Sequence, residues 1–321
     1  MQTITRRTAF GAAAGLAMPA LAQSVWPTRP IRFISPFAPG GPQEVPGRII
    51  AEHLSQRLGQ PVVIETKPGA GSALGSQYVA RETDGHTFLF TTTSLTTLPA
   101  LMRDPGFDAF TDLVPVTLVS ESSLLLAARA AAPFADFPGL LAAARARPGR
   151  ISFATSGVGS STHLAMALLQ SRTGVEFLHV PYRGAQLALT ALLAGDVDLS
   201  IGDASIPLPH IREGRLRGIA VSTAARSPIL PEVPAMAETV PGYAVPFWFA
   251  LLGSRNTPPE AVEILLREMA PLRAPDGALV PRMAQAGARV LLDGPAALLA
   301  RMRQEVPQWR QVAAAAGITP E

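Results

Sequence analysis

Two loops of the sequence carry residues suited to binding an anion. Phe37-Ala38-Pro39-Gly40-Gly41 follows a short apolar segment, and Ser156-Gly157-Val158-Gly159 leads into the hydroxyl-rich Ser160-Ser161-Thr162. A helix is predicted after each loop, and the unpaired N–H groups of a helix N-terminus bind carboxylate or phosphate without a lysine or arginine. Glycine lets such a backbone approach a ligand closely. A serine at a helix start is also a common N-cap, so each loop alone indicates a site only weakly.

The elements that must position these loops alternate short strands with helices. Ile31–Ser35, Pro61–Glu65 and Thr87–Thr91 are β-type segments, and the segments between them have helical spacing of apolar residues. The same order starts again at Ile151–Thr155. This alternation predicts an α/β fold with largely parallel strands and helices on both faces. Open sheets of this class bind ligands beyond the carboxyl ends of their strands, where both loops fall.

The repeated order predicts two lobes of similar build. A long apolar strand from Val114 to Ala127 ends the first unit, and the segment after Phe247 has too few strands for a third domain. We therefore expect one lobe from residues 24–125 with 244–321, and a second from residues 126–243. The chain would cross between the lobes on two strands, and the cleft between them is the natural place for a ligand.

Composition and motifs exclude several classes of function. The 321 residues include 27 Lys and Arg, 24 Asp and Glu, and no cysteine, so disulfides, thiolate zinc sites and cysteine nucleophiles are excluded. Basic residues are scattered, which argues against nucleic-acid binding. The only lysine, Lys67, precedes a proline, so there is no P-loop. The five histidines form no metal-binding cluster and there is no GxSxG element, so we expect no metal, no cofactor and no catalytic residues.

The first 22 residues are predicted to be an export signal and not part of the fold. Arg6 and Arg7 precede an apolar segment from Ala9 to Leu21, and Ala20-Leu21-Ala22 resembles a cleavage site. The paired arginines resemble a twin-arginine signal. The apolar segment is shorter than the ~20 residues of a membrane-spanning helix. We therefore expect an exported, soluble, periplasmic protein.

Several motifs resemble the Bug family of periplasmic solute-binding proteins, the receptors of tripartite tricarboxylate transporters. The motifs are Phe37–Gly41, Glu65–Gly71, Pro115–Val119, Val180-Pro181-Tyr182-Arg183-Gly184 and Leu208–Ile211, and the resemblance extends from about Trp26 to Ile318. It implies a two-lobed periplasmic binding protein, type II-like, that closes on a small carboxylate such as a dicarboxylic acid, an amino acid or an aromatic acid. In that family the loops matched by Phe37–Gly41 and Ser156–His163 hold the carboxylate through N–H groups, hydroxyls and ordered water.

The sequence departs from the family pattern at three places. Glu44 stands where Asp is usual, Gly47 stands where Ala is commoner, and the strand after Asp198 ends in Gly202-Asp203 where Asp-Asn is usual. One step along a strand turns a side chain to the opposite face. We therefore expect Asp203 either to recognise an amino or hydroxyl group of the ligand in its own way or to face away from it.

The predicted ligand-binding residues lie on the two loops and at nearby strand ends. They are Phe37, Pro39, Gly40, Gly41, Ser94, Ser156, Gly157, Ser160, Ser161, Thr162, His163, Tyr182 and Asp203. The predicted function is an extracytoplasmic receptor that captures a small carboxylate between its lobes. Its partner would be membrane permease subunits if the role is uptake, or a sensor-kinase ectodomain if the role is sensing. We expect a monomer that binds no nucleic acid. The alternative is an enzyme, a lyase or transferase, that acts on a similar anion in the same cleft.

Overall fold

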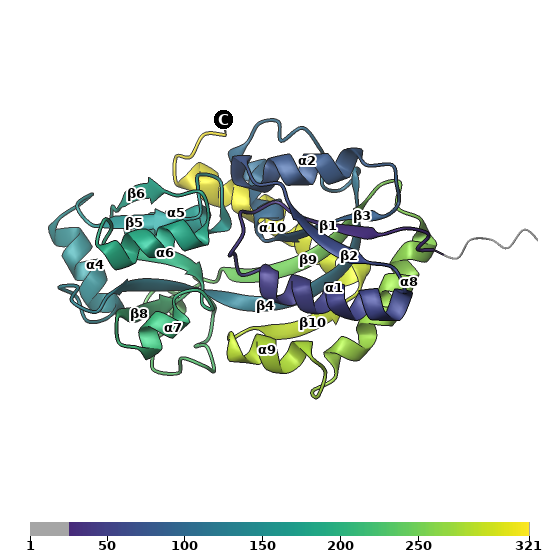
Figure 1. Ribbon diagram of the computed structural model, residues 1–321. Helices are drawn as coiled ribbons and strands as arrows, with labels where there is room; N and C mark the ends of the chain where they lie inside the picture. The colour runs from purple at the N-terminus through teal and green to yellow at the C-terminus, as the bar shows by residue number, and fades with distance from the viewer. Residues whose placement is uncertain (1–25, 321) are drawn as a thin grey trace, which may run out of the picture.

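The computed structural model describes residues 26–320 of the chain (Figure 1). The predicted export signal, residues 1–22, lies outside the described residues. The elements form two groups of strands covered by helices, and both groups share the long strand β4, Leu113–Arg129. The fold is α/β, as the sequence predicts. No helix within residues 26–320 is long and apolar enough to span a membrane.

The larger group of strands, here called the large sheet, has the order β2-β1-β3-β9-β4, with β10 also paired to β4. β1, β2 and β3 are parallel, whereas β9 and β10 run antiparallel to their neighbours. Its further strands are β1 (Ile31–Ser35), β2 (Val62–Thr66), β3 (Thr87–Thr92), β9 (Pro246–Ser254) and β10 (Arg289–Asp293). Its helices are α1 (Glu44–Leu58), α2 (Ala73–Arg81), α3 (Ser94–Leu101), α8 (Pro259–Met269), α9 (Leu279–Gln285) and α10 (Pro295–Ala315), with the 3-10 turns η1 (Ala70–Ser72) and η3 (Ala270–Arg273).

The smaller group, here called the small sheet, has the order β4-β7-β5-β6, with β8 also paired to β4. β5 is parallel to both β6 and β7, whereas β7 and β8 run antiparallel to β4. Its further strands are β5 (Ser152–Thr155), β6 (Leu178–Pro181), β7 (Leu199–Asp203) and β8 (Leu216–Val221). Its helices are α4 (Phe137–Ala146), α5 (Ser161–Thr173), α6 (Ala185–Ala194) and α7 (Leu208–Arg212), with the 3-10 turn η2 (Met236–Glu238).

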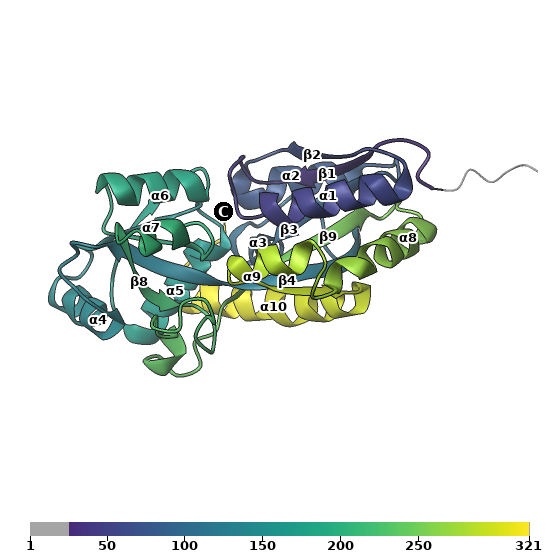
Figure 2. The same cartoon turned by 60° about the horizontal axis from the view of Figure 1, so that its bottom comes forward.

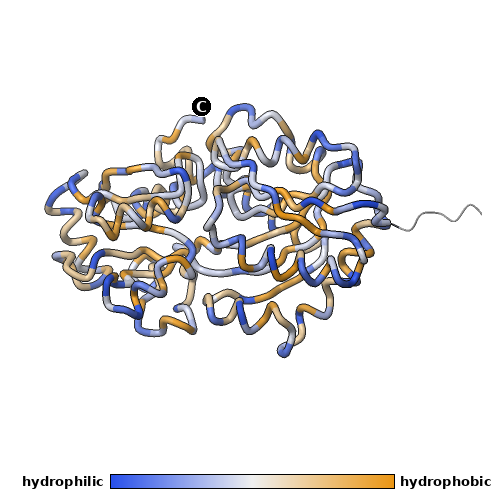
Figure 3. Tube along the Cα trace, in the orientation of Figure 1, coloured by the Kyte–Doolittle hydropathy of each residue, from blue (hydrophilic) through white to orange (hydrophobic). Residues whose placement is uncertain are grey.

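Stacked aromatic rings hold the strands of the large sheet together. The ring of Phe90 lies between those of Phe33 and Phe249. Its centroid is 6.3 Å from that of Phe33 and 6.5 Å from that of Phe249, and all three side chains are buried. Figure 3 shows the apolar segments of the chain concentrated inside the two groups of elements. Because β9 is antiparallel to β3, the carboxyl end of β3 and the start of β9 meet at one edge of the sheet.

β4 changes the strand with which it pairs between two consecutive residues. Ser123 is its last residue paired with β9, opposite Pro246, and Leu124 is its first residue paired with β7, opposite Asp203. At the same place the start of β9 is tied to the end of β8, because Val245 N–H donates to the carbonyl of Ser222 at 2.8 Å. Two neighbouring chain segments therefore connect the two sheets.

The C-terminal helix α10 reaches from the large sheet to the small one. It packs against α3 and β4 and also against α5. Figure 2 shows it along one side of β4, with α1 and α2 on the other side. Its buried Glu305 accepts hydrogen bonds from Thr96 Oγ1 at 2.8 Å and from Trp248 Nε1 at 3.0 Å, and burial raises the pKa of this carboxyl. This network fixes the start of α3 against β9.

Candidate functional site

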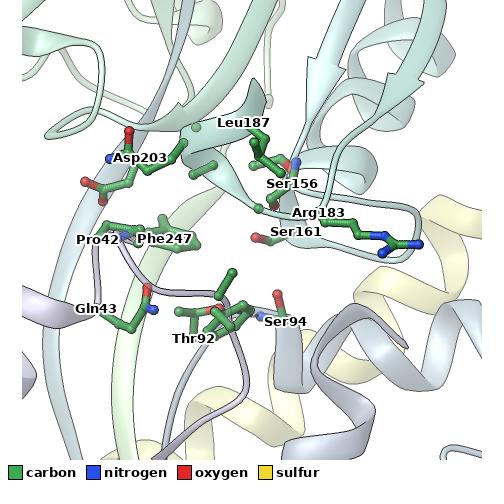
Figure 4. A pocket seen from close by; sticks show the side chains of 18 of the residues that line it. Pro42, Gln43, Thr92, Ser94, Ser156, Ser161, Arg183, Leu187, Asp203 and Phe247 are labelled. Atoms are coloured by element: carbon green, nitrogen blue, oxygen red, sulfur yellow. Dashed lines mark hydrogen bonds between the residues drawn. The ribbon is translucent and has the colours of Figure 1, made fainter. Parts of the chain in front are cut away.

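A cavity of about 320 Å³ lies between the two sheets, a volume suited to a small organic molecule (Figure 4). From the large sheet and its loops it is lined by Phe37, Ala38, Pro39, Gly41, Pro42, Gln43, Thr92, Ser94 and Phe247. From the small sheet and its loops it is lined by Ser156, Ser161, Thr162, Arg183, Gly184, Ala185, Gln186, Leu187, Gly202 and Asp203. The cavity lies at the carboxyl ends of β1, β3, β5, β6 and β7, as expected for an open α/β sheet.

Four helices begin at this cavity. The first residues of α3, α5 and α6 line it, as does the N-cap of α1, Gln43. Each helix N-terminus carries about half a positive charge from its unpaired N–H groups. In Figure 4, Thr92 and Ser94 lie across the cavity from Asp203 and Leu187. The electrostatic environment therefore favours an anion even though the surrounding walls are mostly apolar.

The loop before α5 is held by its own hydroxyl groups. Ser160 is the N-cap of α5, and its Oγ accepts from His163 N–H at 3.3 Å. Thr162 Oγ1 lies 2.7 Å from Ser160 Oγ and 3.0 Å from Ser156 Oγ, and it accepts from Ser156 N–H at 3.1 Å. Because the cap uses the third N–H of the helix, the N–H groups of Ser161 and Thr162 have no partner within α5. Both residues line the cavity and are buried.

The loop before α1 uses its polar groups differently. Gly40 N–H donates to the side chain of Glu44, the first residue of α1, so an internal carboxylate already occupies this helix start. Pro39 and Pro42 have no N–H to offer. Gly40 does not line the cavity, although it was among the predicted ligand-binding residues. Pro39 and Gly41 do line it, together with Phe37.

Gly40 instead connects the two sides of the cavity mouth. Its carbonyl accepts from Gln186 Nε2 of α6 at 2.8 Å. The φ of Gly40 is +82°, which favours glycine, and a Cβ at this position would lie 2.9 Å from Gln186 Cγ. This hydrogen bond joins the loop before α1 to the start of α6.

The start of α6 forms a third wall of the cavity that was not predicted from the sequence. Gly184 is its N-cap, with φ of 121° and no side-chain cap, and Ala185, Gln186 and Leu187 follow it along the cavity. The N–H groups of these first helical residues have no partner within the helix. The order strand, glycine, helix is the same as in the two loops that were singled out, and this order could have identified the third wall.

Asp203 forms part of the cavity at the end of β7. It is 4% exposed, and its carboxylate accepts hydrogen bonds from Ser122 Oγ, from Ser205 N–H at 3.0 Å and from Ser205 Oγ. Burial raises the pKa of this carboxyl, an effect that the three hydrogen bonds partly offset. Within residues 26–320, no lysine, arginine or histidine forms an ion pair with it. Asp203 is one of the residues that line the cavity.

Four other predicted residues lie outside the cavity lining. Gly157 and Ser160 shape the loop before α5, and Tyr182 packs beside the apolar cluster under α6. His163 faces away from the cavity. Its ring stacks on that of His179 at 4.3 Å, and burial lowers the pKa of both imidazoles.

Of the predicted set, the cavity brings together Phe37, Pro39, Gly41, Ser94, Ser156, Ser161, Thr162 and Asp203. It also includes Thr92, which follows a strand end next to the predicted Ser94, and Gln43 and Phe247, which carried no sequence signal of their own. Arg183 lines the mouth, but it is exposed, and Figure 4 shows its guanidinium directed away from the other labelled side chains. No group of His, Cys, Asp and Glu in residues 26–320 could hold a metal ion.

Comparison with known proteins agrees with this geometry. Residues 47–289 match the family described as tripartite tricarboxylate transporter family receptor. The chain is 35% identical over 307 residues to protein BugT of Bordetella pertussis (strain Tohama I), an alignment that covers 94% of each chain. The structure of the periplasmic binding protein BugD superposes with a TM-score of 0.86 at 33% identity, covering 92% of this chain and 100% of that one. Rpa4515 of R. palustris, solved with adipate, superposes with a TM-score of 0.87 at the same identity and coverage.

Proposed function

The chain belongs to the tripartite tricarboxylate transporter receptor family, and we propose that it captures a small carboxylate in the cavity between its two sheets. As a member of this family it is a periplasmic solute-binding protein and not an enzyme. The convergence of helix N-termini from both sheets on one cavity carries this proposal. The similar protein solved with adipate supports a carboxylate as the ligand.

The free N–H groups at the starts of α5 and α6 are the principal anion-binding groups. A hydrogen bond to a charged group contributes ~1.5–3 kcal/mol, and micromolar affinity corresponds to about −8 kcal/mol. A few such bonds, with burial of the ligand's apolar part against Phe37 and Phe247, reach this value after the costs of association. No cationic side chain is needed.

Binding is coupled to closure of two lobes, residues 24–125 with 244–321 and residues 126–243. The change of partner along β4 between Ser123 and Leu124 supports the first boundary. The hydrogen bond between Gln186 and Gly40 crosses the cavity mouth, which supports a closed arrangement in this structure. Bending at the two connecting segments would open the mouth and release the ligand.

The partner of the closed form is the set of membrane permease subunits. Membership of a transporter receptor family supports this partner over a sensor kinase. We keep a monomer as the proposed working unit, because the two sheets of one chain supply both sides of the cavity.

Isothermal titration of the mature protein against a panel of dicarboxylates, amino acids and aromatic acids tests this function. We expect micromolar or tighter binding of at least one acid and recovery of that acid unchanged after incubation. Mass spectrometry of the small acids that co-purify with the protein identifies the natural ligand directly. Absence of binding by every acid, or conversion of a bound acid, would contradict a carboxylate receptor.

A further inference from the structure

Asp203 is the only acidic side chain among the described residues that line the cavity. A buried carboxylate opposite several helix N-termini is unexpected in a site that holds an anion, because it repels a ligand carboxylate placed beside it. Its place in the fold is also distinctive. Asp203 is paired with Leu124, the residue at which β4 leaves the large sheet.

The hydrogen bonds of Asp203 leave its negative charge uncompensated. Its partners are the hydroxyls of Ser122 and Ser205 and the N–H of Ser205, all of them neutral. A carboxylate offers about four lone-pair positions, so these bonds leave one position open. The Ser205 N–H is a fixed donor and holds one oxygen as an acceptor. Burying a carboxylate without a cation is costly, and an incoming cationic group would compensate that cost.

Asp203 lines the cavity together with Ser161 and Thr162, the first two residues of α5. The donors at the start of α5 and the acceptor Asp203 therefore border the same cavity and have opposite polarity. Such an arrangement matches a small molecule that carries a carboxylate at one place and a hydrogen-bond-donating cation at another.

We propose that Asp203 determines ligand specificity by accepting a hydrogen bond from a protonated amine, so that small amino acids are preferred over dicarboxylates. The inference rests on the proposed function, because it assigns the second recognition point of the same cavity. In this arrangement the ligand carboxylate is bound by the N–H groups of α5 and α6, and the ligand ammonium by Asp203. A dicarboxylate would instead place its second negative charge beside Asp203.

Matched pairs of ligands that differ only in the amine provide the test. Isothermal titration compares alanine with propionate, leucine with 4-methylpentanoate, aspartate with succinate and glutamate with glutarate. For the pair that binds wild-type protein most tightly, we expect the aminated member to bind at least tenfold more tightly than its deaminated partner. The corresponding 2-hydroxy acid, which offers a neutral donor, should fall between the two.

The Asp203→Asn variant removes the charge and keeps an oxygen that can accept from Ser205 N–H. Its affinity for the aminated member should fall at least tenfold. Its affinity for the deaminated member should stay within about threefold of the wild-type value. The matched control is Gly202→Ala, which adds a methyl group at the neighbouring residue of the cavity lining without changing its charge and should change the affinity for both members by the same factor. A melting curve of each empty variant shows that it is folded.

The outcomes separate this inference from the function on which it rests. Wild-type protein that binds the deaminated member as tightly as the aminated one would overturn the role of Asp203 while leaving the carboxylate receptor intact. An amine preference that persists in Asp203→Asn would do the same. If no acid of either kind binds to wild-type protein, both the inference and the proposed function are wrong. The comparison of ligands on wild-type protein stands even if the variant fails to fold.

Discussion

The loop before α1 and the loop before α5 both follow a strand, contain glycine and end at a helix, yet they offer different groups to the cavity. Before α5, hydroxyls bond to one another and leave the N–H groups of Ser161 and Thr162 free within the helix. Before α1, Gly40 N–H is taken by Glu44, and prolines remove two further donors. The first loop therefore contributes shape and a contact across the mouth, and the second contributes hydrogen-bond donors.

This difference shows that a glycine loop at a helix start is not sufficient to form an anion site. What matters is whether neighbouring side chains already use the N–H groups. Glu44 places a carboxylate at the start of α1, where the helix dipole favours it, and so competes with an external anion. The N-cap Ser160 takes only one N–H of α5 and leaves two.

The largest predicted effect comes from removing a main-chain donor of the loop before α5. Proline is well tolerated at the first position of a helix, and Ser160 already has the extended backbone that a following proline requires. Ser161→Pro should weaken carboxylate binding by about 100-fold, since it removes an N–H and a hydroxyl. Ser161→Ala, which removes only the hydroxyl, should weaken it by about 10-fold. Isothermal titration measures both variants.

Unchanged affinity in Ser161→Pro, with a normal melting curve, would show that the donors of α5 do not bind the ligand. Arg183→Ala serves as the control, because its guanidinium is directed away from the cavity. This variant should bind within about twofold of wild type, a difference well below that of one charged hydrogen bond.

The next effect concerns the shape of the loop before α1. Valine at Gly40 would have to adopt a left-handed conformation and would bring its Cβ to 2.9 Å from Gln186 Cγ. Gly40→Val should therefore disfavour closure and weaken binding by about 10- to 30-fold, with little change in the melting temperature of the empty protein. Isothermal titration measures the loss of affinity, and differential scanning calorimetry measures the melting temperature of the empty protein. If stability falls together with affinity, the loop has a structural role in the open form as well.

A smaller effect is expected for the hydrogen bond across the mouth. Gln186→Ala removes the bond to the Gly40 carbonyl but keeps the helix and its N–H groups. A neutral hydrogen bond contributes ~0.5–1.5 kcal/mol, so affinity should fall by about 2- to 10-fold for every ligand alike. Stopped-flow kinetics should place the loss in the dissociation rate. Faster dissociation of one ligand class only would mean that Gln186 contacts the ligand itself.

The smallest effect is on stability, and it depends on pH. Burial, and then the neighbouring His163, lower the pKa of His179 to about 4, so the folded protein favours neutral imidazole. Stability supported by His179 is therefore complete above pH 6.5 and is lost as the pH falls from 6.5 towards 4. Because His179 is partly exposed, the expected loss is only about 1 kcal/mol.

Thermal melts of wild-type protein and His179→Gln between pH 7 and 4.5 measure this loss. Glutamine keeps a partner for Thr155, which lies 2.7 Å from His179 Nε2. The melting temperature of the variant should depend less on pH than that of the wild-type protein. Identical curves would exclude His179 as the source of the change.

The order of strands and helices could be predicted from the sequence because each element has its own periodicity and boundary residues. Strand Ile31–Ser35 agrees with its predicted bounds, since a proline stands on each side of it. Helix α3 was not predicted, because it is short, rich in threonine and contains Pro99. β10 was also missed, since it is a short strand with a break in register against β4.

The details of the site could not be predicted because they depend on contacts between distant residues. The bond between Gln186 and Gly40 joins positions 146 residues apart, and no local pattern reports such a pair. From the sequence, Asp203 could either recognise a ligand group or face away from the ligand. Strand periodicity does not decide between these, because it does not give the direction of a side chain at a strand end relative to a neighbouring sheet. The lobe boundaries and the full set of ligand-binding residues stay predictions.

A crystal structure of the protein with the tightest-binding acid of the panel tests the central claim most directly. The account predicts a ligand carboxylate oxygen within hydrogen-bond distance of the main-chain nitrogen of Ser161 or Thr162, with no lysine or arginine side chain in contact. A carboxylate paired with Arg183, or a ligand bound outside the cavity between the sheets, would contradict it.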